Sequence, residues 1–116
     1  MEKMSVQNLK NQSFLGHVLI AKSFKARTKG LLGSKELPDY QGLLINPCMQ
    51  VHTIGMNYPI SIWFVNYDNK IIRIIDELKP YRISPCLFNS HYVIEFPANW
   101  AEKTGSNEGD YLKLFK

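Results

Sequence analysis

The amino-acid sequence predicts a mainly β protein, built as an antiparallel sandwich or a partly closed barrel with two short helices. Three observations predict this class. Roughly six to eight apolar runs have strand length, turn-forming residues separate them, and only two segments have helical signals. With 116 residues, of which 45% are hydrophobic, the chain suits one domain with its own core.

The N-terminal segment is polar and has few large apolar side chains. We therefore expect residues 1–12 to form a flexible tail and residues 13–116 to form a single globular domain. Apolar residues become frequent over 14–20, and this run predicts the first strand of the domain.

A helix is predicted directly after this strand. Ser23 offers a side-chain oxygen for the N-cap. Phe24, Arg27 and Leu31 follow at i, i+3 and i+7 spacing, so they lie near one face of the helix. Gly33 is a suitable residue to end it.

Two buried strands are predicted in the middle of the chain. The first is short, 42–46, and the second, 60–67, is the most apolar stretch of the sequence. Both faces of the second strand are largely apolar, so we expect it to lie centrally with both faces covered. Residues 48–58 between them are expected to be irregular, although 51–53 could still pair with a strand.

A hairpin is predicted after the central strand. Asp68 and Asn69 tolerate positive φ better than most residues, so they suit a two-residue loop. The return strand is expected over 70–78. A short strand over 81–84 and another over 91–96 then follow.

The last two elements are a short helix and a strand. Asn99 can cap the helix, and Glu102 stands at the N3 position of a capping box. Gly105 is expected to end this helix. The final strand is predicted over 110–115.

The net charge of +4 is unevenly distributed. Residues 1–35 hold seven basic residues and one acidic residue, whereas residues 36–116 hold seven basic and nine acidic residues. An anion-binding surface would therefore involve the first third of the chain. The residues that could form it are Lys22, Lys25, Arg27, Lys29 and Lys35. Apart from Phe24, this run lacks the interleaved aromatic residues that stack on bases, so we do not expect a nucleic-acid partner.

The sequence also indicates a cellular compartment. No apolar run has the length of a membrane-spanning helix, and the N-terminus lacks the apolar stretch of a secretory signal. We therefore expect a cytoplasmic protein with no membrane partner. In a reducing cytosol, Cys48 and Cys86 are expected to be free thiols.

Several ordered blocks carry a resemblance to a known family. They are Arg27 with Gly30–Gly33, then Gly42–Ile45, Cys48–Val65, Glu95–Ala98 and Gly109–Asp110. Together they resemble the uncharacterised family called domain of unknown function 192, over roughly 21–114 of this chain. The resemblance implies a mainly β, jelly-roll-like sandwich, and it implies no established activity and no metal.

Two positions depart from the pattern of that family. Ser61 stands where the family usually has aspartate, so any role of that carboxylate as a base or a metal ligand would be lost or altered here. Asn99 stands where glycine is usual, and asparagine can adopt the same left-handed backbone conformation.

The central block also holds the first candidate site residues. Cys48 and His52 are four residues apart, and an imidazole beside a thiol could activate it as a nucleophile. We favour the simpler interpretation, a buried thiol and a histidine bonded to the backbone. Cys86 and His91 add two ligand types that zinc prefers, but their spacing matches no zinc motif, so we predict no metal and no cofactor.

Arg27 and Glu95 could form an ion pair or a substrate clamp. A strand carboxylate among apolar neighbours needs a donor, and arginine presents a planar pair of donors. We favour structural pairing, and for Ser61 we favour a hydroxyl satisfied by a neighbour. The six candidate ligand-binding residues are Arg27, Cys48, His52, Met56, Ser61 and Glu95.

Three functions from different classes fit this sequence. The first is small-molecule binding at a pocket near 48–61, where thiol, imidazole and hydroxyl groups would share one opening. The second is a protein-interaction module without catalysis. The third is a weak anion or nucleic-acid binder that uses the basic helix over 22–35. We rank them in that order, and the sequence assigns no reaction, substrate or partner.

Overall fold

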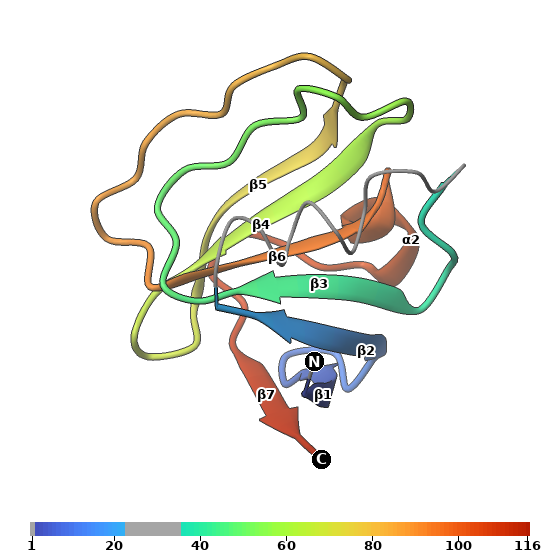
Figure 1. Ribbon diagram of the computed structural model, residues 1–116. Coiled ribbons are helices and arrows are strands. Elements are labelled where there is room, and N and C mark those ends of the chain that lie inside the picture. Colours follow the sequence, from blue (N-terminus) through green and yellow to red (C-terminus); the bar gives the residue numbers. More distant parts are fainter. Residues whose placement is uncertain (1, 23–35) are drawn as a thin grey trace.

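The computed structural model describes residues 2–22 and 36–116, so the helix predicted from Phe24 lies outside the described residues. The described chain forms one seven-stranded sheet with the order β5-β4-β6-β3-β2-β1-β7 (Figure 1). All neighbouring pairs are antiparallel except β2 and β3, which are parallel. The strands are β1 (Lys3–Asn8), β2 (Phe14–Ala21), β3 (Gln41–Ile45), β4 (Ile60–Val65), β5 (Ile71–Leu78), β6 (Tyr92–Pro97) and β7 (Leu112–Phe115), and the helix is α2 (Trp100–Thr104).

The sheet curls, and its two edge strands meet at one end. Lys70, just before β5, forms a bridge with Tyr111, just before β7. The Ile71 amide donates to the Asp110 carbonyl at 2.9 Å, and the Leu112 amide donates to the Asn69 carbonyl at 2.8 Å. The prediction of a mainly β, partly closed barrel is therefore confirmed. Within the described ranges, α2 is the one helix, and no helix is long and apolar enough to span a membrane.

Two apolar cores lie on opposite faces of the sheet. The inner core lies inside the curl, and every strand contributes to it together with Trp100 and Ala101 of α2. The outer core lies between β3, β4, β6 and the segment that precedes β4. Residues 60–65 are buried throughout, as predicted for a central strand with both faces covered.

The N-terminal segment differs from its prediction. Residues 3–8 form β1, which pairs with β2 on one side and β7 on the other, so the expectation of a flexible tail is wrong there. Only alternate residues of this strand need to be apolar, because one face packs on the core. Val6 is fully buried and Met4 packs against the inner core.

Three local predictions also need correction. The hairpin loop holds three residues instead of two, because the Asn66 amide donates to the Lys70 carbonyl at 3.0 Å; Asn69 has the expected positive φ of 62°. Residues 81–84 contribute one isolated bridge, between Ile83 and His52, and no strand. Asn99 adopts the left-handed conformation but its side chain does not cap α2.

Tyr92 gives the closed end of the sheet a testable pH dependence. Its hydroxyl donates to Asn69 Oδ1 at 2.9 Å, and burial raises the pKa of Tyr92 well above the ordinary value of 10.0. The unfolded chain ionises near pH 10 while the folded chain keeps the proton. The contribution of protonated Tyr92 to the free energy of unfolding is therefore complete below about pH 10. It is lost as the pH rises further, by about 1.4 kcal/mol per pH unit.

Urea denaturation at about pH 9 and pH 11 tests this effect. Between these values the wild type should lose about 1.3 kcal/mol more stability than Tyr92→Phe, because phenylalanine has no proton to release. Equal losses in the two proteins would show that Tyr92 is as easily ionised in the folded chain as in the unfolded one.

Candidate functional site

The sequence-predicted site residues are distributed over both faces of the sheet. Glu95 is fully buried on β6 and lies directly between Leu43 of β3 and Ile62 of β4, on the face of the outer core. A carboxylate in such apolar surroundings must interact with other polar groups to remain there. Arg27, its predicted partner, lies outside the described residues.

Cys48, His52 and Met56 come from the segment that precedes β4. Met56 is buried in the outer core, and Cys48 packs against that core. The Cys48 thiol donates to the Gln50 carbonyl at 3.2 Å, and His52 Nδ1 accepts from the Ile54 amide at 3.2 Å. These contacts are bonds between side chains and the local backbone.

Ser61 faces the opposite side of β4. It alternates with Ile60 and Ile62 of the outer core, so it lies on the side of Trp63 and the inner core. Its hydroxyl donates to Asp76 Oδ1 at 2.6 Å and accepts from Trp63 Nε1 at 2.8 Å. The structure therefore does not bring Ser61 together with Cys48 and His52 at one opening.

Asp76 explains how the chain accommodates Ser61. From β5, its carboxylate accepts hydrogen bonds from the Ala101 amide at 2.9 Å and the Glu102 amide at 3.0 Å. It therefore caps the N-terminus of α2, where free amides need acceptors. In this chain the carboxylate beside position 61 therefore comes from β5, and it positions the helix.

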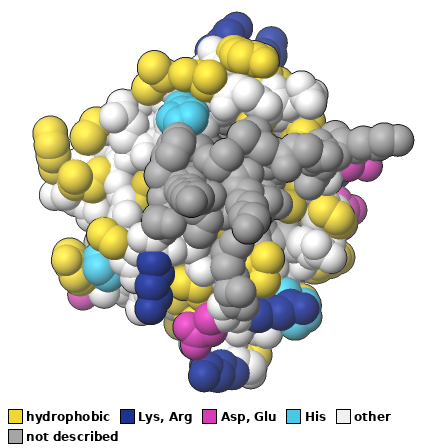
Figure 2. All heavy atoms as spheres, in the orientation of Figure 1, with side chains coloured by type: hydrophobic (Ala, Val, Ile, Leu, Met, Phe, Trp, Pro, Cys, Tyr) yellow, Lys and Arg dark blue, Asp and Glu magenta, His cyan; other side chains and the backbone are white. Residues whose placement is uncertain are grey.

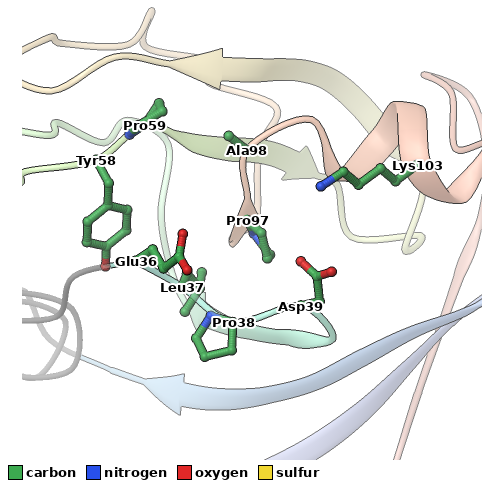
Figure 3. Close-up of a pocket in the computed structure, with 9 residues that line it drawn as sticks. All are labelled: Glu36, Leu37, Pro38, Asp39, Tyr58, Pro59, Pro97, Ala98 and Lys103. Atoms are coloured by element: carbon green, nitrogen blue, oxygen red, sulfur yellow. The ribbon is translucent and has the colours of Figure 1, made fainter.

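A pocket of about 470 Å³ lies where α2, the start of β4 and the end of β6 approach the segment before β3 (Figure 3). We call it the Tyr58 pocket. Its described lining residues are Glu36, Leu37, Pro38, Asp39, Tyr58, Pro59, Pro97, Ala98 and Lys103. The pocket is formed by four segments that are far apart in the sequence.

The Tyr58 pocket combines apolar walls with charged groups. Lys103 extends from α2 toward the pocket, and the carboxylates of Glu36 and Asp39 come from the opposite wall (Figure 3). Tyr58 is 7% exposed and contributes an aromatic wall. Ligand pockets typically combine apolar walls with a few polar groups in this way.

Backbone pairing fixes the walls of the Tyr58 pocket. Ile60 is paired with Pro97, so the residues before β4 and after β6 lie side by side. The Gln41 amide donates to the Pro38 carbonyl at 3.2 Å, and the His17 amide donates to the Tyr40 carbonyl at 2.9 Å. These bonds hold the segment that carries Asp39 against β2.

The remaining cysteine and histidine residues do not gather around a metal position. Among the described residues, no three histidine, cysteine or acidic side chains are placed to hold a metal ion. No disulfide bond joins Cys48 and Cys86. His91 stacks on Tyr67 with ring centroids 3.8 Å apart.

None of the described candidate site residues lines the Tyr58 pocket. The sequence predicted a pocket near 48–61, and of that segment only Tyr58 and Pro59 line the Tyr58 pocket. Sequence reasoning missed the acidic residues and Lys103 because nothing in their local pattern marks them. A signal was nevertheless present, since Tyr58-Pro59 and Pro97-Ala98 belong to two of the blocks that carry the family resemblance.

Comparisons with known proteins agree with that resemblance. The model of the family DUF192, described as "Uncharacterized ACR", matches residues 6–114. The UPF0127 protein of Pyrococcus horikoshii is 32% identical in an alignment 117 residues long, which covers 97% of this chain and 99% of the relative.

Two solved structures share the fold. One is a Novosphingobium aromaticivorans protein of unknown function, with a TM-score of 0.80 and 22% identity over 96% of this chain and 83% of that one. The other is a Sinorhizobium meliloti protein named provisionally as a transcription regulator, with a TM-score of 0.79 and 19% identity over 97% and 92% of the two chains. At these identities the likeness concerns the fold alone.

Proposed function

The chain belongs to the uncharacterised family DUF192, and from that premise we propose that it binds a small molecule in the Tyr58 pocket. One observation carries the proposal. Two separate blocks of the family resemblance, 48–65 and 95–98, meet at this pocket through Tyr58-Pro59 and Pro97-Ala98.

The charges of the pocket support a small polar ligand. Glu36, Asp39 and Lys103 are exposed at its edge, so they can exchange water for ligand groups. Pro38, Pro59 and Pro97 have no backbone N–H, so these walls offer apolar contact and carbonyl oxygens. A ligand with an apolar body and polar ends therefore fits this lining. The proposal includes no reaction.

Filling the pocket tests the proposal. Ala98→Trp would place a large ring in a space bounded by Tyr58 and Lys103. In a thermal-shift screen of small amines, amino acids, carboxylic acids, sugars and nucleosides, a ligand at ten times its Kd stabilises by about 1.4 kcal/mol. This should raise the Tm of the wild type by roughly 4–6 °C and leave that of Ala98→Trp unchanged.

Tyr67→Trp is the matched control for this screen. Tyr67 is 79% exposed on the β4–β5 loop, outside the pocket, so its variant should respond to ligands as the wild type does. Compounds that stabilise the wild type and Ala98→Trp equally would place their binding elsewhere and remove the pocket from the proposal.

A further inference from the structure

A second surface lies on the outward face of β7, β1 and β2. The inner core covers the other face of these strands, and the outer core reaches only Ala21 at the end of β2. Cross-strand pairing arranges the outward residues in rows. One row is Phe115, Ser5 and His17, the next is Lys113, Gln7 and Phe14, and a third is Lys3 and Leu19.

Aromatic rings on this surface are exposed and contact one another. Phe14 is 41% exposed, and Tyr40, which also meets the ring of Trp100 edge-on at 4.9 Å, is 51% exposed. Their ring planes are inclined by 11°, with centroids 6.1 Å apart, and His17 meets Phe14 edge-on at 5.2 Å. Exposed rings of this kind provide stacking surfaces for bases.

The charge of this surface favours an anionic partner. Strands β1, β2 and β7 contain two lysines, Lys3 and Lys113, and no acidic residue. Lys113 Nζ lies 5.6 Å from the centroid of the Phe115 ring, so charge and ring are adjacent. Glu2, next to β1, is paired with Lys116 at 3.5 Å. At the lower right of Figure 2, a histidine lies beside lysine or arginine side chains in the region of β1 and β2.

From this arrangement we infer that the outward face of β7, β1 and β2 binds single-stranded nucleic acid. Stacking on Phe14 and Tyr40 requires unpaired bases, which a duplex does not offer. Lys3 and Lys113 then contact backbone phosphates. A lipid surface is a poorer partner for this face, because the exposed rings lie on a sheet and do not form a protruding apolar element that could insert into a membrane.

This site is independent of the basic segment considered from the sequence. There, Phe24 is the one aromatic residue among the lysine and arginine residues. Here the rings and the lysines come from β1, β2, β7 and the residue before β3, and these strands are adjacent in the sheet. The inference does not depend on the Tyr58 pocket.

Fluorescence anisotropy with labelled oligo-dT and oligo-rU of about 12 nucleotides tests the inference. We expect binding that weakens as salt rises. Phe14→Leu and Tyr40→Asn should each weaken it by about 5- to 100-fold, since each removes one stacking ring. Asparagine is chosen because residue 40 has a φ of 61°, which asparagine tolerates.

Lysine variants separate charge from stacking. Lys3→Gln and Lys113→Gln should each reduce the slope of log K against log salt by about 0.7. Phe88→Leu, at an aromatic residue that is 84% exposed on the 79–91 loop, and Lys79→Gln should leave affinity and slope unchanged. Ala98→Trp should also bind as the wild type does.

Three results would overturn the inference. The first is no anisotropy change at low salt. The second is binding to vesicles of phosphatidylserine and phosphatidylcholine without binding to either oligonucleotide. The third is oligonucleotide binding that Phe14→Leu and Tyr40→Asn leave intact. Circular dichroism and urea denaturation of each variant confirm that the folded protein is being compared.

Discussion

Gly16→Ala is expected to lower the free energy of unfolding by about 3–5 kcal/mol. Gly16 has a φ of 136°, a conformation that residues with a side chain rarely adopt. A Cβ atom there would lie 2.6 Å from both the carbonyl carbon and the carbonyl oxygen of Tyr40. These are backbone atoms, so the strand and the 38–41 segment would have to separate.

That separation would affect both proposed sites. The segment carries Asp39 of the Tyr58 pocket and Tyr40 of the outward surface. Gly109→Ala is the control, because Gly109 also has positive φ, 97°, but no atom lies within 4 Å of its added Cβ. In urea denaturation, Gly109→Ala should lower the free energy of unfolding by only about 1–2 kcal/mol. Equal losses in the two variants would show that the approach of Tyr40 to Gly16 contributes nothing.

Asp76→Ala is expected to lower the free energy of unfolding by about 2–4 kcal/mol. The substitution leaves the Ala101 and Glu102 amides without their cap and the Ser61 hydroxyl without its acceptor. Loss of a helix cap costs up to about 2 kcal/mol, and a buried polar group left without a partner adds roughly 1–3 kcal/mol. Urea denaturation measures the loss, and Glu77→Ala, at the exposed neighbouring residue, should stay within about 0.5 kcal/mol of the wild type.

A swap tests whether the capping carboxylate can come from either strand. Asp76→Ser should be destabilised to a similar extent, and adding Ser61→Asp should restore at least about half of the loss, because the two side chains are 2.6 Å apart. A double variant no more stable than Asp76→Ser would contradict the expectation that a carboxylate at position 61 can cap α2 as Asp76 does.

The sequence predicted elements whose signals are local. Strand β4 was predicted because both of its faces are apolar over Ile60–Val65, and Gly105 was correctly predicted to end α2. Strand β1 was missed because its sequence is mostly polar, and it forms because β2 and β7 supply partners on both sides. The helix cap was assigned to Asn99 because Asp76 is 25 positions before Ala101, and no local pattern links them.

The site could be predicted less well than the fold. Strand alternation alone implies that Ser61 faces away from Ile60 and Ile62, but which face the preceding segment covers depends on the tertiary structure. The Tyr58 pocket joins residues from 36–39, 58–59, 97–98 and 103, so only the folded sheet brings them together.

The most direct test of the pocket is to map where a stabilising compound binds. In an amide NMR titration with a compound selected by thermal shift, the largest changes should fall on Leu37, Asp39, Tyr58, Ala98 and Lys103. A second hollow of about 480 Å³, lined by residues of β5 and the 86–89 loop, provides an internal comparison. Changes confined to Ile72, Arg73 and 86–89, or spread over the surface with none at the Tyr58 pocket, would contradict the proposed binding of a small molecule in the Tyr58 pocket.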